Sequence, residues 1–313
     1  MVYNMRPYTG EVDRQRVLAF RRACTTPENM NDYPTVTDMQ ELLDPLVIGA
    51  GERDTVRLWE DDRGELQAFA ILHFPYCNLY FYVQPCAQDE EIARQIIDWG
   101  TDRVRAFGQA RGQRVMLDTN CRNTDKARLA LLEGSGFTRQ EAYTLRMTCS
   151  LLATLSSFRL PHGYMLGHVA GEHEVESYVA LHRAAFGTEN MTVEARLATM
   201  RNPDYIPELD LVAVAPDGTL AAFCFCQVYR EANALNRRAG GEIATIGTIP
   251  ALRHKGLGRT MLRAGMHALQ ARGIATAVLG TSSENASAQS LFLAEGFHIA
   301  EEIFWYSKSV DPA

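Results

Sequence analysis

An internal repeat constrains the fold of this chain more than any other sequence feature. Leu132–Phe137 (Leu-Glu-Gly-Ser-Gly-Phe) and Leu293–Phe297 (Leu-Ala-Glu-Gly-Phe) both end in a Gly-Phe pair, and the two pairs are related by an offset of 160 in the numbering. Two further markers keep this order and nearly this offset: Thr119-x-x-x-Asn123 with Thr281-x-x-x-Asn285, at an offset of 162, and Ala110-Arg111-Gly112 with Ala271-Arg272-Gly273, at an offset of 161. Three markers in one order predict two copies of one fold.

The length of 313 residues also favours two domains. Pro161-His162-Gly163 interrupts the regular pattern between the two copies, which predicts a boundary there and domains spanning 1–158 and 159–313. Strand and helix patterns alternate in both halves. We therefore expect an α/β (mixed α+β) class in which each domain is a mostly antiparallel mixed sheet with helices on both faces.

The element order supports this duplication. In the first half we expect strands at 3–8, 55–60, 66–74, 78–83 and 114–119, and helices at 13–24, 90–107 and 125–133. In the second half we expect strands at 164–169, 209–215, 220–229, 242–249 and 276–281, a strand pair over 297–307, and helices at 172–186, 193–200, from 257, and at 286–295. Pro216-Asp217-Gly218 predicts a hairpin turn, because Pro presets φ and Gly supplies a positive φ.

Composition narrows the function classes. A formal net charge of −7 argues against a protein that binds nucleic acid through its phosphates. The sequence has neither an apolar run long enough to cross a bilayer nor a secretory h-region, so we expect a cytoplasmic protein without a membrane partner. The seven cysteines include no Cys-x-x-Cys and the eight histidines no His-Glu-x-x-His, so no metal site is predicted.

The segment from Thr248 to Arg259 is the most informative one for function. A predicted strand ends, a proline follows, and Arg253-x-x-Gly256-x-Gly258 opens a helix. The first N–H groups of a helix have no partner within the helix, and the helix dipole is positive at that end. Glycines let an anion approach the backbone, and the neighbouring cations add positive potential. This pattern predicts a site for a pyrophosphate.

The succession of strand, glycine loop, helix, strand, Asn-led helix and Gly-Phe resembles the GCN5-related N-acetyltransferase (GNAT) family. The resemblance covers most of residues 164–307 and extends more weakly to 3–149, and the tandem arrangement is similar to that of mycothiol synthase-type acetyltransferases. It implies acetyl-CoA as co-substrate, with no metal. It also implies these cofactor-binding residues in the second half: Gly247, Thr248, Ile249, Arg253, His254, Lys255, Gly256, Leu257, Gly258, Arg259, Asn285 and Phe292.

The corresponding loop of the first half carries a different chemistry. When Pro85 is aligned with Pro250, Gln88 replaces Arg253, Glu91 replaces Gly256 and Ala93 replaces Gly258. Asp89, Glu90 and Glu91 place negative charge where a pyrophosphate would lie. We therefore predict that the first domain has a GNAT-like fold without a CoA site, and that each chain binds one CoA.

Acetyl transfer to an amine requires a base, because an alkyl ammonium must lose a proton before it can attack. The resemblance assigns this role to Glu242, and assigns the polarisation of the thioester carbonyl to backbone N–H groups near 247–249. A splayed strand with a bulge would provide such N–H groups. The family's usual tyrosine acid falls on Phe292, so a water, Tyr306 or Ser290 remains as the proton donor. Of these, Tyr306 is named with Glu242 as catalytic.

The leading hypothesis is an N-acetyltransferase that acts on a primary amine of a small molecule or peptide through a direct ternary complex. The acceptor would meet residues 186–191 and 301–306, where carboxylates and aromatic side chains suit a cation. Two alternatives remain open: a non-catalytic acyl-CoA-binding sensor or interaction module, and an acyltransferase that uses a different acyl donor. No oligomeric state is predicted.

Overall fold

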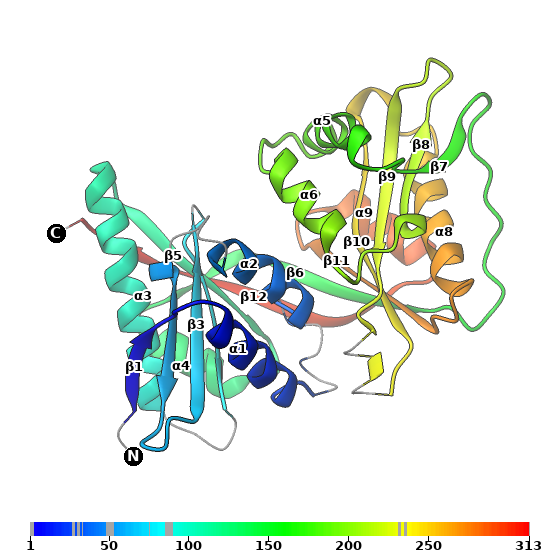
Figure 1. Ribbon diagram of the computed structural model, residues 1–313. Helices are drawn as coiled ribbons and strands as arrows, with labels where there is room; N and C mark the ends of the chain where they lie inside the picture. Colours follow the sequence, from blue (N-terminus) through cyan, green and yellow to red (C-terminus); the bar gives the residue numbers. More distant parts are fainter. Residues whose placement is uncertain are drawn as a thin grey trace. The chain divides into compact units, whose positions relative to one another are not determined.

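The computed structural model describes residues 3–26, 29, 32, 34–47, 53–74, 76–84, 90–230, 233–234 and 237–312. The chain forms two compact units. Unit 1 comprises Met1–Thr144, Ser282–Glu284 and Glu301–Ala313, and unit 2 comprises Leu145–Thr281 and Asn285–Ala300. Figure 1 colours the helices and strands of both units in chain order, from blue at the N-terminus to red at the C-terminus. These spatial units do not coincide with the segments 1–158 and 159–313, whose separate roles remain a prediction.

Unit 1 holds the following elements: β1 (Asn4–Pro7), α1 (Glu11–Ala23), α2 (Val36–Val47), β2 (Val56–Glu60), β3 (Leu66–His73), β4 (Asn78–Val83), α3 (Glu90–Arg111), β5 (Val115–Arg122), α4 (Lys126–Gly134) and the start of β6 (Thr138–Ser150). Its strands follow the order β1-β2-β3-β4-β5, and β12 (His298–Val310) lies beside β5. The helix α2 and the strand β6 were not predicted from the sequence.

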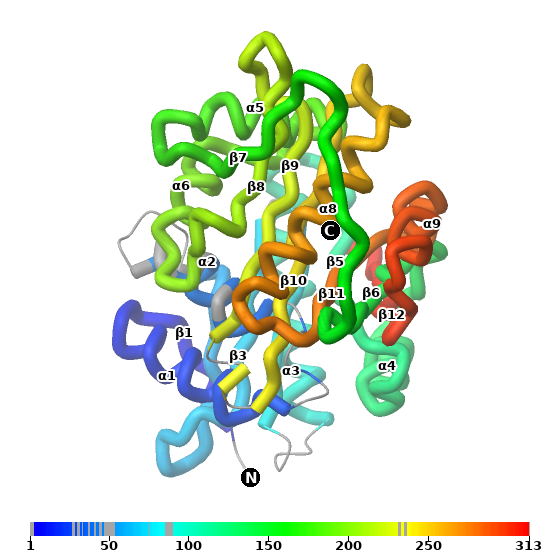
Figure 2. Tube along the Cα trace, turned by 90° about the vertical axis from the view of Figure 1, so that its right-hand side faces the viewer, coloured from blue at the N-terminus to red at the C-terminus, as the bar shows by residue number. Residues whose placement is uncertain are grey.

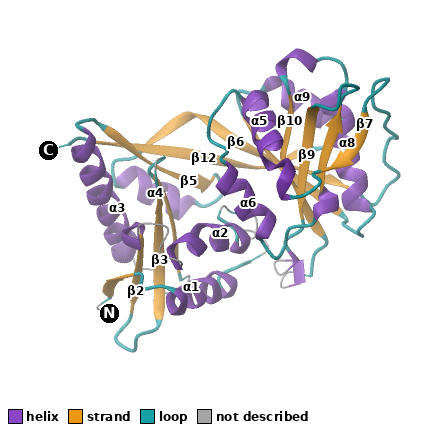
Figure 3. Cartoon of the chain, turned by 45° about the horizontal axis from the view of Figure 1, so that its top comes forward, coloured by secondary structure: helices purple, strands orange, loops and turns teal. Residues whose placement is uncertain are grey.

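Alternation along β3 builds the two apolar cores of unit 1. Ala68, Ala70 and Leu72 pack with α3, whereas Phe69 and Ile71 pack with α1 and α2. Successive strand residues point to opposite faces, so a continuous apolar run is what a strand covered on both faces requires. Helices therefore cover both faces of this sheet, as predicted (Figure 3).

Unit 2 holds β7 (Met165–His168), α5 (Val175–Phe186), α6 (Val193–Arg201), β8 (Asp210–Val214), β9 (Leu220–Gln227), β10 (Gly240–Thr248), α8 (Leu257–Gln270), β11 (Thr276–Ser282) and α9 (Ala286–Ala294). Short 3₁₀ turns lie at Glu172–Glu174, Pro207–Leu209 and Pro250–Leu252, and one lies in unit 1 at Arg53–Thr55. The strand order is β11-β10-β9-β8-β7, in which β10 pairs antiparallel with β9 and parallel with β11.

The hairpin between β8 and β9 confirms the turn predicted at Pro216-Asp217-Gly218. The Gly218 N–H donates to Ala215 O at 2.9 Å, and Gly218 has φ 85°. Asp217 accepts from the Thr219 N–H at 3.0 Å and its hydroxyl at 2.7 Å. The sequence placed this turn correctly because every interaction that stabilises it is local.

The C-terminal strand differs from its prediction. Residues 297–307 were expected to form a strand pair, but His298–Val310 is one continuous strand. From Ile303 opposite Arg122 to Val310 opposite Val115, it pairs antiparallel with β5, which belongs to unit 1. Conversely, Leu145–Ser150, the end of β6, belongs to unit 2, where the Leu151 N–H donates to Ala275 O at 2.8 Å. Each unit thus contains a strand segment from the other end of the chain.

The helix caps correct one marker of the repeat. Asp125 caps α4 through the Arg128 N–H, and Asn285 caps α9 through the Ala288 N–H, both at 3.1 Å. The two caps are related by an offset of 160 in the numbering, the same as that of the Gly-Phe pairs. The pairing of Asn123 with Asn285, at an offset of 162, was therefore out of register.

The helix α8 packs closely on the face of unit 2 opposite to α5. A Cβ at Gly265 would lie 2.7 Å from Cys224 Sγ and 3.0 Å from Cys226 Sγ. Phe223, which points to the other face, contacts the ring of Tyr178 in α5 with a centroid separation of 5.3 Å. The small residue in α8 thus allows the helix to reach the two thiols of β9.

Replacing Gly265 should therefore destabilise the protein. Gly265→Ala puts a methyl group inside the contact distance of two buried sulfurs, and we expect a loss of about 1–3 kcal/mol in the free energy of unfolding. Gly134→Ala is the matched control, because a Cβ there meets nothing within 4 Å in the last turn of α4. Denaturant titration of both variants measures the difference, and equal stabilities would contradict this account of the packing.

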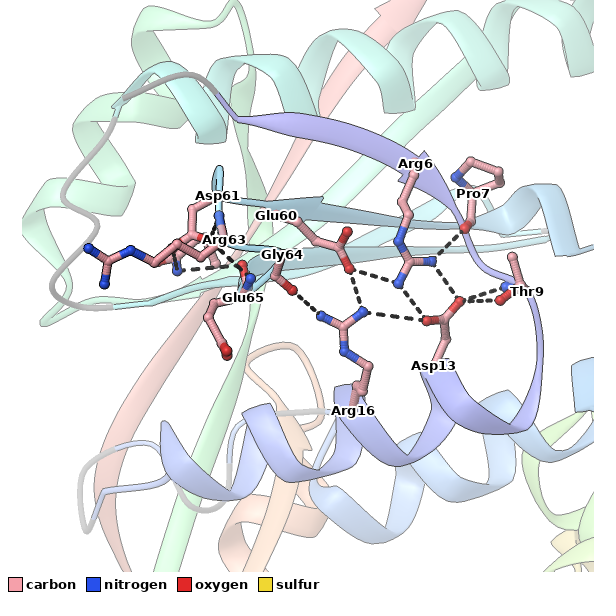
Figure 4. Close-up of polar contacts among 11 residues, drawn as sticks. Arg6, Pro7, Thr9, Asp13, Arg16, Glu60, Asp61, Arg63, Gly64 and Glu65 are labelled. Atoms are coloured by element: carbon pink, nitrogen blue, oxygen red, sulfur yellow. Dashed lines mark hydrogen bonds and ion pairs between the residues drawn. The ribbon is translucent and has the colours of Figure 1, made fainter.

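A charged network joins β1, α1 and β2 in unit 1 (Figure 4). Arg6 donates to both Asp13 oxygens, at 2.7 and 2.6 Å, and to Glu60 at 2.7 Å, while Arg16 bonds the same Glu60 oxygen and Gly64 O. Burial raises the pKa of Asp13, but the hydrogen bonds from Arg6 and Thr9 lower it to about 2. The network therefore favours the ionised carboxylate.

This shift predicts a pH-dependent stability. Because the pKa of Asp13 is depressed on folding, its contribution is present above the ordinary value of 3.8 and is lost as the pH falls toward 2. Asp13→Asn should be less stable than the wild type by about 1–2 kcal/mol at pH 6, and the gap should close between about pH 4 and 2. Unfolding midpoints measured across this range test the prediction. A gap that persists unchanged at pH 2 would rule out a titration effect.

Candidate active site

The segment between β10 and α8 has the geometry of an anion cradle. After Thr248 the chain makes a 3₁₀ turn, then passes through two residues with positive φ, His254 (62°) and Gly256 (83°). Gly256 caps α8 without a side chain, so the first N–H groups of the helix have no side-chain cap. Figure 2 shows this connection, in which β10 (yellow) leads into α8 (orange). The predicted glycine loop is therefore present at a helix N-terminus.

The four cations of the loop have different roles. Arg253 donates to Ala185 O at 2.7 Å and to Thr248 O at 3.3 Å, so it fastens the loop to the end of α5. Arg259 forms an ion pair with Glu295 at 3.1 Å. His254 and Lys255 are exposed beside the helix N-terminus. Two of the four predicted anion ligands thus have structural partners already.

A buried hydroxyl lies at the same place. Thr248 Oγ1 is buried and makes no hydrogen bond within the described part of the chain. It lies 3.7 Å from the position that a Cβ of Gly258 would take. An unsatisfied buried hydroxyl costs free energy unless a ligand or water completes it. Thr248 therefore offers a polar group next to the loop. The side chain of Leu257, another predicted cofactor-binding residue, is buried.

β10 separates from its parallel neighbour in the middle of the strand. It pairs with β11 only over Gly240–Glu242, opposite Thr276–Val278, and its register against β9 shifts between Ile243 and Thr245. This shift is the bulge that the proposed chemistry requires, and nothing in the sequence showed it. Beyond it the β11-facing edge of β10 leaves the ladder.

The hydrogen bonds of β10 narrow the choice of backbone donor. The Ile249 N–H donates to Ala221 O at 3.2 Å, so it points toward β9. N–H groups alternate in direction along a strand, so Gly247 points the same way and Thr248 points to the side where β11 has separated. Of the three predicted donors, Thr248 is the one whose N–H faces the opened edge.

Glu242 is the last residue of β10 that pairs with β11, and it lies opposite Gln227 of β9. Gln227 shares its face of β9 with Phe225 and Phe223, the face covered by α5 and α6. The Glu242 Oε2 accepts a hydrogen bond of 2.6 Å from the Tyr229 hydroxyl. The predicted base is therefore half-buried beside a phenol, at the point where the two strands part.

An aromatic stripe on α5 forms the wall of this face. Tyr178, His182 and Phe186 recur at helical spacing and pack on Phe223. His182 is 9% exposed, and its Nδ1 has no hydrogen-bond partner in the described part of the chain. Burial, and then the charge of Arg196, lowers its pKa, so the ring is neutral at pH 7. Sequence reasoning missed His182, although its helical spacing with aromatic residues was visible.

A buried ion pair between α6 and β8 packs against this aromatic stripe. Arg196 and Asp210 are fully buried and bonded to each other, and the Arg196 guanidinium lies 3.9 Å from the centroid of the Tyr178 ring. The Tyr205 hydroxyl also donates to Asp210 at 2.6 Å. Pairing and cation–π contact offset the cost of burying the two charges. The pair therefore fixes α6 against β8 and the aromatic wall.

Comparisons with known proteins agree with this geometry. Residues 175–297 match the family described as Acetyltransferase (GNAT). This matched segment belongs to the GNAT family. Relatives named mycothiol acetyltransferase include proteins of Arthrobacter sp., 30% identical over 50% of this chain and 49% of the relative, and of Kineococcus radiotolerans, 31% identical over 54% of each. The chain spans about half the length of these curated relatives.

Solved structures match the whole fold. A GCN5-related N-acetyltransferase from Sphaerobacter thermophilus has a TM-score of 0.72 at 19% identity, covering 99% of this chain and 96% of that one. A tandem GNAT protein from the clavulanic acid biosynthesis pathway has a TM-score of 0.72 at 13% identity and full coverage of both chains. These likenesses confirm the predicted tandem GNAT fold with mixed α/β architecture.

Phe292, at the position of the family's usual tyrosine, and Tyr306, the predicted catalytic tyrosine, are both buried. Phe292 is 3% exposed and packs against Phe297 in the core, with ring centroids 6.0 Å apart. Tyr306 is buried in unit 1, where it pairs with Thr119 and donates to Glu133 at 3.0 Å. Its pKa is raised by burial and by this carboxylate. Because β12 continues into unit 1, Tyr306 and residues 301–306 belong to unit 1, whereas Glu242 belongs to unit 2. The catalytic role of Tyr306 and the acceptor role of residues 301–306 stay predictions.

Asn285, at the GNAT position expected to contact the cofactor, is exposed and serves as the cap of α9. The two roles are compatible, because the cap uses only Oδ1. No helix in the described part of the chain is long and apolar enough to cross a membrane. Among the same residues, no three His, Cys, Asp or Glu side chains gather as a metal site would require.

Unit 1 has a comparable opening between strands. β4 pairs with β5 only at Asn78 opposite Asp118, and a cavity of about 60 Å³ lies beyond this point. Arg128 fills part of the gap: its Nη1 donates to Phe81 O at 3.2 Å, and its guanidinium lies 4.0 Å from the centroid of the Phe81 ring. At the repeat offset of 160, the residue in unit 2 is Ala288. At this position of the repeat, unit 1 thus has the long, charged side chain of Arg128 and unit 2 has the methyl group of Ala288.

The first-half counterpart of the glycine loop lies partly outside the residues that the structure describes. The residues outside are Pro85, Cys86, Ala87, Gln88 and Asp89. Glu90 and Glu91 begin α3, where they contact Arg94 at 2.8 Å and Gln95 at 3.2 Å. Carboxylates at this end of a helix are favourable by themselves. They also occupy the end of the helix that an anion would approach.

Proposed function

We propose that this protein is an acetyl-CoA-dependent N-acetyltransferase that acetylates a primary amine of a small molecule or peptide through a direct ternary complex. One observation carries the proposal. β10 separates from β11 directly after Glu242, passes through a bulge between Ile243 and Thr245, and continues into a glycine-capped helix N-terminus. A single strand thus presents a carboxylate, an exposed backbone edge and an anion cradle in sequence. The names of the curated relatives support transfer of an acetyl group.

The cofactor would meet three groups of this chain. The pyrophosphate would lie on the N–H groups of Leu257, Gly258 and Arg259 at the start of α8, with His254 and Lys255 adding positive charge. The Thr248 N–H faces the opened strand edge, where the thioester carbonyl needs donors, and the buried Thr248 hydroxyl lies next to Gly258. Asn285 would approach the pantetheine arm from α9. Arg253 supports this arrangement indirectly, by holding the loop on α5.

Unit 1 would carry no cofactor in this proposal. Arg128 satisfies the Phe81 carbonyl where the strands part, and Glu90 and Glu91 occupy the first turn of α3. A pyrophosphate at that turn would meet like charge. One CoA per chain is the expected stoichiometry, which isothermal titration calorimetry can count.

The reaction needs a base more than it needs an acid. Glu242 first takes the ammonium proton, directly or through water, and releases it to solvent. The neutral amine nitrogen then forms a bond to the acetyl carbon, and the tetrahedral intermediate loses its remaining extra N–H proton to Glu242. The C–S bond then breaks, its electron pair stays on sulfur, and the thiolate takes a proton from solvent. Because the thiol has a pKa near ~8.5, it can leave without a dedicated acid. The buried Phe292 is thus compatible with catalysis.

Glu242→Gln tests the catalytic role. The amide keeps the shape of the side chain but cannot accept the ammonium proton, so we expect kcat to fall by about 10²–10⁴-fold while CoA still binds. Glu194→Gln is the matched control, because Glu194 is an exposed residue of α6 in the same unit. Thiol release from acetyl-CoA is followed with an amine panel. Tight CoA binding with no turnover above the Glu242→Gln background would favour a non-catalytic sensor.

Gly258→Glu tests the anion cradle. Gly256 is the poorer position for this purpose, because its positive φ would strain any replacement. A Cβ at Gly258 meets its nearest atoms at 3.7 and 3.9 Å, so the side chain is tolerated, and a carboxylate in the first turn favours the helix. We expect CoA affinity to fall more than about 30-fold with an unchanged or raised melting temperature.

Gly258→Gln separates charge from size in this experiment, since its side chain has nearly the same volume. It should weaken CoA binding only a few-fold. If the Gln and Glu variants lose the same affinity, steric exclusion explains the result. If neither loses affinity, the cofactor does not lie on this helix.

A further inference from the structure

The Tyr229 hydroxyl is the phenol that the structure places at the proposed base. It donates to Glu242 Oε2 at 2.6 Å and lies 3.2 Å from Gln227 Oε1. We propose that Tyr229 is a positioning residue that orients the Glu242 carboxylate toward the acceptor amine and keeps it ionised. This inference rests on the proposed function of the same site. Tyr229 was not among the residues singled out from the sequence.

The backbone around Tyr229 is held in place independently of this hydrogen bond. Asn233 donates to Gly240 O at 2.7 Å and accepts from the Gly240 N–H at 3.1 Å, as a neighbouring strand would. The Asn233 N–H in turn donates to Tyr229 O at 2.9 Å. Gly240 precedes Glu242 on the same strand, β10. Asn233 thus connects the segment that follows β9 to the start of β10, through its backbone N–H on one side and its side chain on the other. This connection fixes the Tyr229 phenol relative to the Glu242 carboxylate.

A phenol in this position affects both the charge and the orientation of the Glu242 carboxylate. By donating to the carboxylate, it favours the ionised form, which attracts an ammonium group and can accept its proton. By bonding Oε2, it restrains the rotation of the carboxylate, so less entropy is lost when the amine binds. During acetyl transfer the ammonium proton moves to Glu242, and Tyr229 keeps its own proton throughout.

Other titratable groups lie on the elements of this sheet and its helices in unit 2. Cys226 lies on β9, and its pKa is raised well above the usual value by the contact with Cys224, by burial, and by the charges of Cys224 and Glu242. Burial raises the pKa of Tyr178 on α5 to about 12, and burial and the charge of Arg196 keep His182 neutral at pH 7. Arg196 and Asp210 compensate each other's charge. Of the groups named here, Glu242 is the carboxylate to which the Tyr229 hydroxyl donates, and His182 belongs to the aromatic wall of α5.

Tyr229→Phe tests the inference. The variant removes one hydroxyl and keeps the ring, so the pKa of Glu242 should rise. Activity then requires a higher pH, and the acidic limb of the kcat/KM profile should move upward by about one pH unit. We also expect kcat at pH 7 to fall by about 10-fold, with the KM for acetyl-CoA unchanged. A structural effect alone would lower activity evenly across the pH range.

Two controls keep the outcomes separate. Tyr164→Phe removes a phenol of unit 2 that follows the Pro161-His162 segment, away from Glu242 in the sheet, and should leave the profile unchanged. Glu242→Gln decides the proposed function itself. If it abolishes turnover while Tyr229→Phe leaves the acidic limb in place, Tyr229 does not position the base, and the proposed function stands. If Glu242→Gln retains full activity, both proposals fail.

Discussion

The separation of β10 from β11 after Glu242 is the constraint on which the rest of the site depends. Two parallel strands that remain paired satisfy each other's backbone groups and leave no donor for a ligand. Two strands that part release these groups, which then need new partners. The bulge between Ile243 and Thr245 and the glycine-capped start of α8 lie on the same strand. The carboxylate, the exposed edge and the loop therefore form one continuous structural feature.

The two units show two solutions to this problem. In unit 1 the strands also part, but Arg128 bonds the Phe81 carbonyl and covers its ring, so the protein supplies the missing partner itself. In unit 2 Ala288 cannot reach across, and Thr248 Oγ1 stays without a partner in the described part of the chain. One residue difference at the repeat offset thus accompanies the difference between an opening that Arg128 partly fills and the opening that we propose for the cofactor.

The sequence predicted those features that depend on neighbouring residues. The β8–β9 turn and the glycine loop at the start of α8 both follow from local backbone preferences, and both are present. The bulge of β10 depends on register against β9, which no local pattern encodes. The pairing of β12 with β5, in which Tyr306 lies opposite Thr119, is likewise a long-range contact that no local pattern encodes. The α2 helix was missed within the long segment between the predicted helix 13–24 and strand 55–60.

The engaged cations change how the proposed cofactor would be recognised. Arg253 and Arg259 look from sequence like phosphate ligands, yet one fastens the loop to α5 and the other bonds Glu295, which Arg263 also contacts at 2.6 Å. Guanidinium groups held in this way order the cradle, and their existing hydrogen bonds leave fewer N–H groups for a ligand. Recognition must then rest mainly on the backbone N–H groups of α8, which are fixed before binding and need no reordering. Such a cradle selects a phosphate by the shape of the backbone, and the long cations serve chiefly to hold that shape.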